Sequence, residues 1–390
     1  MRRATTAHGC PNQTTKLLFP AQVAQLAPII VATSPVATPI PSPNISPPSL
    51  LSPSRAQAVA EEAERLGSKR EDEEKKRQWE TMFSTPRRSR KITDPNLSRP
   101  VLIFGMPGLQ PGQFSCPWGV AFDKKNKRII VTDSKNHRVQ LFDRQGKFVL
   151  LFGGAGEENG KFNQPEGVCV LPETNQIVVV DNNNHRVQAF SEDGKYMFTL
   201  GQGRMGSSAG QLRFPIGVNV NSQGNIMVAD SGNHRIQIFD KNGHFIKTFG
   251  SQGQGEDQFN IPSDLCIDAE GRILVSDYGN HRVCVWATDG SKCLRIIDAV
   301  SLQLGENERM FEYPRGICIH PSGHHIVACG PPSSMVFIID ASTGNLIRML
   351  SSKNNKKGQI MTPHGVCLDE DGRLVVADYR NHQIQVFMVA

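Results

Sequence analysis

The stretch that decides the fold runs from Arg128 to Phe142 and reads RIIVTDSKNHRVQLF. Near copies follow at residues 177–190, 225–239, 273–286 and 374–387. Each copy is an apolar run, an Asp-x-x-Asn-His segment and a run of alternating polarity, which predicts strand, turn and strand. We expect the Asp to bond the backbone of its own turn and the Asn to tolerate a left-handed conformation. These polar residues are therefore interpreted as structural turn residues: Asp133, Asn136, His137, Asp181, Asn184, His185, Asp230, Asn233, His234, Asp277, Asn280, His281, Asp378, Asn381 and His382.

A second landmark, Pro-x-Gly-Val or a near variant, precedes each unit. It begins at residues 117, 165, 215, 262, 314 and 363, at intervals of 48, 50, 47, 52 and 49 residues. In most units a glycine turn and one further strand follow the repeated stretch, which gives four strands in each period. A fixed period of this length with four strands is typical of a propeller blade. We therefore predict an all-β, six-bladed propeller.

The sixth unit provides only three strands before Ala390, whereas Pro100–Gly105 reads as a fourth strand without its first three. We predict that this segment pairs with the last unit and closes the ring, because closure removes an exposed sheet edge. The fifth unit departs from the pattern, with Cys329-Gly330-Pro331-Pro332-Ser333-Ser334 at its turn. This turn has either drifted without consequence or been remodelled for a partner.

The predicted domains are a disordered Pro/Ser-rich tail at 1–53, a charged helix with a basic linker at 54–98, and the propeller at 99–390. Residues 1–53 contain no acidic residue and too little apolar surface to offset ordering entropy. In the second segment, apolar residues at helical spacing precede a charge-rich run, which is typical of a solvated helix or the end of a coiled coil. The short basic cluster at 87–91 is read as a linker, with a nuclear-import or phosphorylation element as the alternative.

Charge and cysteine usage limit the function classes. Residues 100–390 carry 28 basic and 28 acidic side chains, so this part is not a globally basic nucleic-acid binder. The nine cysteines are scattered without a Cys-x-x-Cys pair, which favours a reduced cytoplasmic protein or a nuclear one. No apolar run approaches the roughly 20 residues that cross a membrane. Prolines within residues 1–53 disfavour a signal or transit peptide.

The least uniform positions of the repeat are expected on the propeller face that holds the Asp-x-x-Asn-His turns. They combine cations with aromatic rings, the groups that meet phosphates and stack on bases in single-stranded RNA. Glu166 and the overall neutrality argue against this interpretation, and the same residue types also anchor protein interfaces. The candidate RNA-binding or partner-binding residues are Trp118, Lys135, Arg213, Tyr278, Tyr313, Arg315, His364, Tyr379 and Arg380.

The repeated stretch, Pro-x-Gly-Val and Gly112-Gln113-Phe114 resemble the NHL-repeat family, most closely the carboxy-terminal propeller of the tripartite-motif NHL group. The resemblance implies a propeller that binds RNA and represses target messages, or one that binds proteins. Full-length members carry a RING finger and B-boxes upstream. Cys10 is the only cysteine before Cys116, so this chain does not support ubiquitin-ligase activity of its own. A substrate-recognition part of a ubiquitin-ligase-related protein remains an alternative.

An enzyme is not expected. The histidines occur once per blade around a ring, too far apart for one metal ion. NHL-like propellers also occur in a secreted metal-dependent amidation family, but no secretory signal or paired cysteines are evident here. No Ser-His-Asp grouping or phosphate loop stands out from the repeat. We therefore predict no cofactor, no metal and no small-molecule substrate, and partners that are messenger RNA and proteins.

Overall fold

The computed structural model describes residues 99–304, 311–350 and 360–389. The predicted disordered tail (1–53), charged helix and basic linker (54–98) lie outside the described residues. In the described ranges the regular elements are β-strands and five single turns of 3-10 helix. The all-β prediction is therefore confirmed for the part of the chain that the structure describes.

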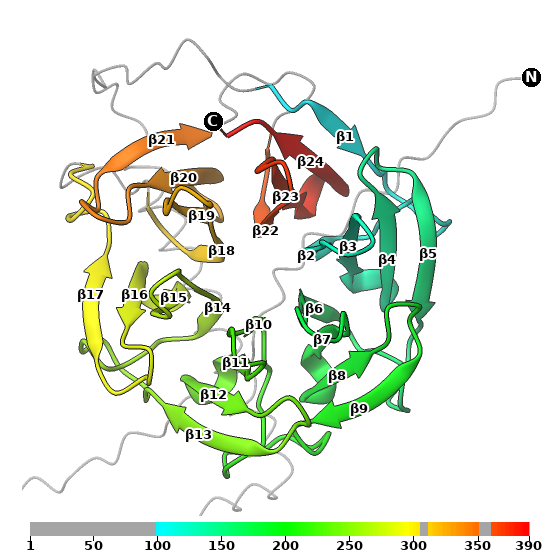
Figure 1. Cartoon of the computed structure of the whole chain (residues 1–390), viewed down its shortest axis with the longest axis horizontal. Coiled ribbons are helices and arrows are strands. Elements are labelled where there is room, and N and C mark those ends of the chain that lie inside the picture. Colours follow the sequence, from blue (N-terminus) through cyan, green and yellow to red (C-terminus); the bar gives the residue numbers. More distant parts are fainter. Residues whose placement is uncertain (1–98, 305–310, 351–359, 390) are drawn as a thin grey trace, which may run out of the picture. The chain divides into compact units, whose positions relative to one another are not determined.

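Six four-stranded antiparallel sheets are arranged in a ring (Figure 1), which confirms the predicted six-bladed propeller. In blades 1 to 5 the four strands follow the chain from the central channel outward. Blade 6 does the same with its first three strands, but its outermost strand comes from the start of the propeller sequence. Blades 1 to 3 are β2 (Pro117–Asp123), β3 (Arg128–Asp133), β4 (Arg138–Asp143), β5 (Phe148–Gly153); β6 (Pro165–Val170), β7 (Ile177–Asp181), β8 (Arg186–Phe190), β9 (Tyr196–Leu200); and β10 (Val218–Val220), β11 (Ile226–Asp230), β12 (Arg235–Phe239), β13 (Phe245–Phe249). Blades 4 to 6 are β14 (Pro262–Ile267), β15 (Ile273–Asp277), β16 (Arg282–Trp286), β17 (Cys293–Ile297); β18 (Pro314–Ile319), β19 (His325–Cys329), β20 (Met335–Ile339), β21 (Leu346–Leu350); and β22 (Pro363–Leu368), β23 (Leu374–Asp378), β24 (Gln383–Phe387), β1 (Leu102–Phe104).

The ring closes through the sixth blade. Strand β1 pairs antiparallel with β24, with Leu102 opposite Val386 and Phe104 opposite Ile384. The Phe104 ring also lies 4.9 Å from that of Phe142 in blade 1, so the closing strand contacts the neighbouring blade as well. The predicted pairing of Pro100–Gly105 with the last unit is confirmed.

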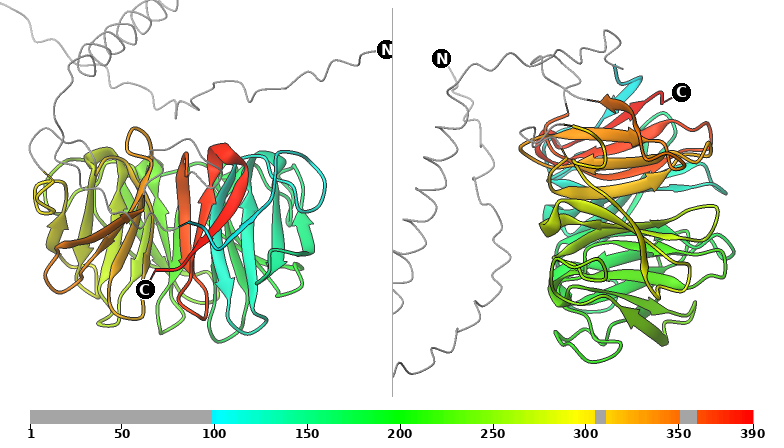
Figure 2. Two further views of the ribbon diagram at one scale, coloured as in Figure 1. Left: turned by 90° about the horizontal axis from the view of Figure 1, so that it is seen from above. Right: turned by 90° about the vertical axis from the view of Figure 1, so that its left-hand side faces the viewer.

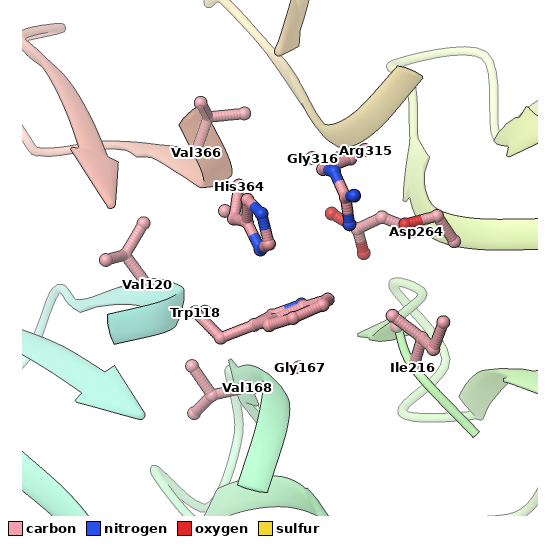
Figure 3. Close-up of a pocket in the computed structure, with 14 residues that line it drawn as sticks. Trp118, Val120, Gly167, Val168, Ile216, Asp264, Arg315, Gly316, His364 and Val366 are labelled. Atoms are coloured by element: carbon pink, nitrogen blue, oxygen red, sulfur yellow. The ribbon is translucent and has the colours of Figure 1, made fainter. Parts of the chain in front are cut away.

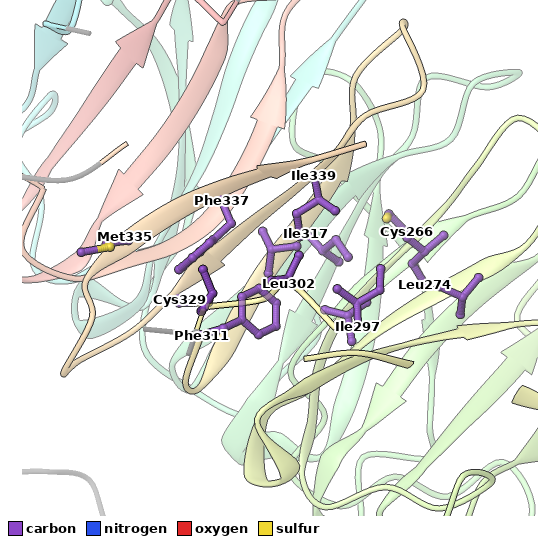
Figure 4. Close-up of a cluster of buried hydrophobic side chains, with 14 residues drawn as sticks. Cys266, Leu274, Ile297, Leu302, Phe311, Ile317, Cys329, Met335, Phe337 and Ile339 are labelled. Carbon is purple, nitrogen blue, oxygen red and sulfur yellow. The ribbon is translucent and has the colours of Figure 1, made fainter. Parts of the chain in front are cut away.

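The core lies between the blades rather than inside any one of them. The second strand of every blade is buried along its whole length or nearly so, because a neighbouring sheet covers each of its faces. Figure 4 shows one such layer, in which Phe311 and Phe337 of blade 5 pack near Ile297 and Leu274 of blade 4. Full burial of an aliphatic or aromatic side chain of this kind stabilises a fold by about 1.5–3 kcal/mol.

The strands run between two opposite faces of the ring (Figure 2). One face, called here the turn face, holds the 3-10 turns η1 (Ser134–Asn136), η2 (Asn182–Asn184), η3 (Ser231–Asn233), η4 (Tyr278–Asn280) and η5 (Tyr379–Asn381), together with the loops that enter the first strand of each blade. A backbone hydrogen bond from Lys135 N to Ser115 O joins a turn to such a loop. The turn face is therefore where the variable residues of the repeat collect.

Candidate functional site

The repeated aspartates tie each turn to the loop that enters the same blade. In blade 1, Asp133 Oδ1 accepts a 2.6 Å hydrogen bond from Ser115 N, while Oδ2 accepts bonds from Asn136 Nδ2 and Arg138 Nε. The expectation that the Asp bonds the backbone of its own turn is wrong, because its carboxylate is directed toward the loop. Burial raises the pKa of the Asp133 carboxyl, and the hydrogen bonds from Ser115, Asn136 and Arg138 oppose that rise.

The left-handed residue of each turn is the histidine and not the asparagine. His137, His185, His234, His281 and His382 have φ between 53° and 55°. The asparagine lies inside the 3-10 turn, where its side chain bonds the aspartate, so the expectation of a left-handed Asn is also wrong. Backbone geometry thus places each imidazole at the end of the turn, directed toward the following blade.

Each of these imidazoles links its blade to the next. His234 Nδ1 accepts a hydrogen bond from Ile261 N of blade 4 at 3.1 Å, and His382 Nδ1 accepts one from Cys116 N of blade 1 at 3.0 Å. His137, His185 and His281 make the equivalent bonds to Gln164, Phe214 and Tyr313. Blade 5 has no histidine at this position, so the junction between blades 5 and 6 lacks this link. The Nδ1 atom of each of these five histidines is therefore engaged in holding adjacent blades together.

Glycines set the width of the central channel. A Cβ atom on Gly365 would lie 2.7 Å from Trp118 O of the next blade, and one on Gly167 would lie 2.5 Å from Ile216 O. The glycine of Pro-x-Gly therefore lets the innermost strands of adjacent blades approach each other. The channel mouth between them encloses about 30 Å³, enough for one or two water molecules but not for a nucleobase.

Aromatic rings and one guanidinium form a connected cluster around this mouth. The Arg315 guanidinium carbon lies 5.5 Å from the ring centre of Trp118, a pair drawn in Figure 3, and 4.8 Å from the ring centre of Tyr278. On one side Tyr278 packs against Tyr313, with ring centres 5.0 Å apart. We call Trp118, Tyr278, Tyr313, Arg315, His364 and Tyr379 the mouth cluster.

The His364 imidazole completes the other side of the mouth cluster. Its ring centre lies 4.1 Å from Trp118 in an edge-on contact and 4.4 Å from Tyr379 in a stacked one. His364 is only 3% exposed, and burial together with the charges of Arg315 and Arg380 lowers its pKa well below the usual value. At neutral pH this imidazole is uncharged, so the positive charge of the mouth cluster is that of Arg315.

Two carboxyl groups lie near the channel, the buried Glu166 and the partly buried Asp264, and burial raises the pKa of both. Glu166 is buried and accepts a hydrogen bond from Asn182 Nδ2, and burial raises its pKa to about 8 against the effects of Arg315 and Lys135. Asp264 stands where other blades have glycine, and burial raises its pKa to about 7 although Ile317 N donates to it. At neutral pH most molecules therefore carry a protonated, uncharged Glu166, and this residue places little negative charge on the turn face.

The structure brings six of the nine candidate binding residues into one cluster, and the other three lie elsewhere on the turn face. Lys135 Nζ donates to Gln164 Oε1 at 3.0 Å, and the charge of Arg213 contributes to the lowered pKa of His185. Arg380 is exposed. Sequence reasoning missed Asp264 and Gly330 as members of the site, although both are departures from an otherwise regular repeat.

Within the described ranges, no group of three or more His, Cys, Asp or Glu side chains is placed to hold a metal ion. The cysteines from Cys116 to Cys367 are free thiols. Among the described residues no helix is long and apolar enough to span a membrane.

Comparison with known proteins identifies the repeats. A family model described as NHL repeat matches residues 114–142, 162–190, 212–239, 259–286 and 361–387, ranges that omit the divergent fifth blade. The chain is similar to Protein lin-41 of Caenorhabditis elegans, with 40% identity over 63 residues, or 16% of this chain and 5% of that protein. Protein brain tumor of Drosophila melanogaster is 51% identical over 45 residues, covering 12% and 4% of the two chains.

Enzymes are also found among the similar proteins. A probable peptidyl-alpha-hydroxyglycine alpha-amidating lyase, pgal-1 of Caenorhabditis elegans, is 31% identical over 116 residues, or 26% of this chain and 33% of the lyase. A gluconolactonase structure from Xanthomonas campestris superposes with a TM-score of 0.52 at 15% identity, covering 71% of this chain and 88% of that one, which shows the fold alone. The matched stretches thus span a third or less of the length of these three relatives. The propeller of this chain therefore contains five NHL repeats, and short parts of its sequence are similar to lin-41 and brain tumor.

Proposed function

We propose that the chain is a non-catalytic, cytoplasmic RNA-binding protein that holds single-stranded or stem-loop RNA on the turn face and so regulates messages after transcription. The observation that carries this proposal is the mouth cluster, where two aromatic rings contact one guanidinium and two tyrosines pack against those rings. Aromatic rings at such a surface stack on bases, each worth about 1–3 kcal/mol, and arginine meets phosphate. In this proposal residues 99–390 are the binding domain.

The geometry favours binding on the surface rather than inside the channel. The mouth is too narrow to admit a nucleobase, so bases would lie against the partly exposed faces of Trp118, Tyr278 and Tyr379. Lys135 and Arg315 supply positive charge, and the buried, largely protonated Glu166 opposes them only weakly. Sorting of charge onto one face thus allows a formally neutral propeller to bind a polyanion.

The test is fluorescence anisotropy with a labelled random single-stranded RNA and a labelled hairpin, at 50 and 200 mM salt. Binding should fall steeply with salt, because phosphate contacts release counterions. Arg315→Glu and Lys135→Glu should each abolish most of the binding. Lys195→Glu is the matched control, because Lys195 lies on the opposite face with its side chain 82% exposed. The proposal fails if the unmodified chain shows no affinity for either RNA at low salt.

A protein-binding scaffold is the second candidate, possibly the substrate-recognition part of a ubiquitin-ligase-related protein. It is favoured by apolar side chains exposed beside the turns, with Leu109 72% and Met106 59% exposed. Asn136 of the first turn and Arg138 at the start of β4 donate to backbone carbonyls of this loop, so the loop lies on the turn face. In such a complex the tryptophan, tyrosine and arginine side chains would be the interface anchors. If the chain binds protein partners but shows no affinity for RNA in the anisotropy assay, this second function is supported.

A further inference from the structure

In four of the five 3-10 turns, the first residue reaches across to the innermost part of the next blade. Asn182 Nδ2 donates to Pro215 O at 2.8 Å, and Ser231 Oγ donates to Pro262 O at 2.5 Å. Where this residue is a tyrosine, the ring packs on the neighbouring channel residue, Tyr278 on Arg315 and Tyr379 on Trp118. These side chains therefore bridge adjacent blades around the channel mouth.

Blade 5 lacks this bridge. Gly330 occupies the position in its divergent turn and has no side chain to reach blade 6. The φ angle of Gly330 is not in the left-handed region, so backbone conformation does not explain the glycine. A Cβ atom there would instead lie 2.8 Å from Arg315 Nε. The glycine thus provides room for the Arg315 side chain at the edge of the mouth.

Two buried nitrogen atoms lie beside this open bridge position. Arg315 Nε and His364 Nδ1 are both buried, and within the described part of the chain neither has a hydrogen-bond partner. Both side chains contact the Trp118 ring and line the same channel mouth, as Figure 3 shows. Burial of polar nitrogen atoms without partners is unfavourable, so an acceptor from a ligand would be stabilised there.

We propose that this place, between Arg315 and His364 beside Gly330, is a phosphate subsite that holds one phosphodiester of the bound RNA. The proposal rests on the proposed function. The phosphodiester lies at the rim, and only its two non-bridging oxygens enter the mouth, which has room for one or two water molecules. The guanidinium donates Nε–H to one of these oxygens, and the neutral imidazole, with its proton on Nδ1, donates to the other. Trp118 and Tyr379 stand beside the subsite, so bases flanking the phosphate can stack, which favours a nucleic acid over an acidic protein segment.

Charges around the subsite agree with an anionic ligand. Arg380 acts on His364, and Lys135 and Arg315 act on Glu166, so three cations surround the mouth. The acidic groups that face it are the buried Glu166 and the partly buried Asp264, with pKa values raised to about 8 and about 7, so at neutral pH Glu166 is mostly protonated and Asp264 is about half ionised.

The experiment measures binding of a labelled random 12-nucleotide RNA to the full chain across a salt series. Gly330→Ser places a side chain against Arg315 Nε and should weaken binding about tenfold, with the salt slope reduced by about one phosphate contact. Arg315→Lys keeps the charge but lacks the Nε donor, so it should show a similar loss. Lys195→Glu changes a side chain that is 82% exposed on the opposite face and should bind like the unmodified chain. Unchanged thermal melting of each variant would show that the fold is retained.

The outcomes separate the two proposals. If Gly330→Ser and Arg315→Lys bind RNA with unaltered affinity and salt slope, the phosphate subsite is overturned while RNA binding stands. If the unmodified chain binds neither RNA nor a labelled poly-glutamate probe, both proposals fall. If it binds a labelled poly-glutamate probe but no RNA, and Gly330→Ser loses that binding, the subsite belongs to an acidic protein partner and the RNA assignment is overturned.

Discussion

Glu166→Gln should make the protein more stable as pH rises, relative to the unmodified chain. The carboxyl is buried beside the channel, and the glutamine amide has nearly the same shape and can still accept the bond from Asn182. Because burial raises the pKa of Glu166, the folded protein holds a proton that the unfolded chain releases. The contribution of Glu166 to stability is therefore fully present below the ordinary pKa and is lost as pH rises toward the folded-state value.

The magnitude follows from the two pKa values. The ordinary glutamate pKa is 4.5, and that of Glu166 is about 8. Between these values each pH unit lowers the free energy of unfolding by about 1.4 kcal/mol. From pH 5 to pH 7 the unmodified protein should therefore lose about 2.5 kcal/mol relative to Glu166→Gln, which has no group to ionise there.

The assay is urea denaturation of both full-length proteins at several pH values between 5 and 8. Burial lowers the pKa of His185, His234 and His382, so their contribution is present above an ordinary pKa of 6.5 and is lost as pH falls through it. These effects occur in both proteins and cancel in the difference. A difference in unfolding free energy that stays constant from pH 5 to pH 7 would refute the protonated state of Glu166.

Three further outcomes are expected. Deleting Pro100–Phe104 should lower the melting temperature of the whole propeller by at least ~5 °C, because the burial of two large apolar side chains is lost and the ring opens. An unchanged melting curve would contradict the closure of the ring by this strand. His234→Ala should lower the free energy of unfolding, measured by urea denaturation, by about 1–3 kcal/mol, because Ile261 N loses its acceptor. His244→Ala is the control and should change this free energy little, because the His244 side chain is 79% exposed. Equal effects of the two substitutions would show that the inter-blade hydrogen bond is unimportant. Tyr379→Ala should weaken RNA binding by about 1–3 kcal/mol in the anisotropy assay, and undiminished affinity would remove this ring from the binding surface.

The propeller architecture could be predicted from the sequence because local sequence patterns determine it. Strand polarity, the six Pro-x-Gly landmarks and the isolated strand at Pro100–Gly105 predict six blades and their closure. Each blade repeats the same contacts with its neighbours, so recognition of one unit describes nearly all of them.

The hydrogen-bond partners of the polar residues could not be predicted in the same way. Asp133 bonds a loop residue 18 positions earlier, and His234 bonds a residue 27 positions later in the next blade. Such contacts depend on how the loops cross the turn face, which polarity patterns do not encode. The protonation of Glu166 likewise depends on burial by other blades. The role assigned to Gly330 became visible only when the bridging side chains of the other turns could be compared.

The sixth blade combines strands from both ends of the propeller sequence, so it can be completed only late in synthesis on the ribosome. Strand β1 is translated before the other strands of the propeller, but its partner β24 is translated last among them. Throughout elongation the earlier blades can stack progressively, while β1 waits without its hydrogen-bonding neighbour. The final register is therefore set only after Gln383–Phe387 leaves the exit tunnel, and until then a chaperone or a second nascent chain has access to the same unpaired edge.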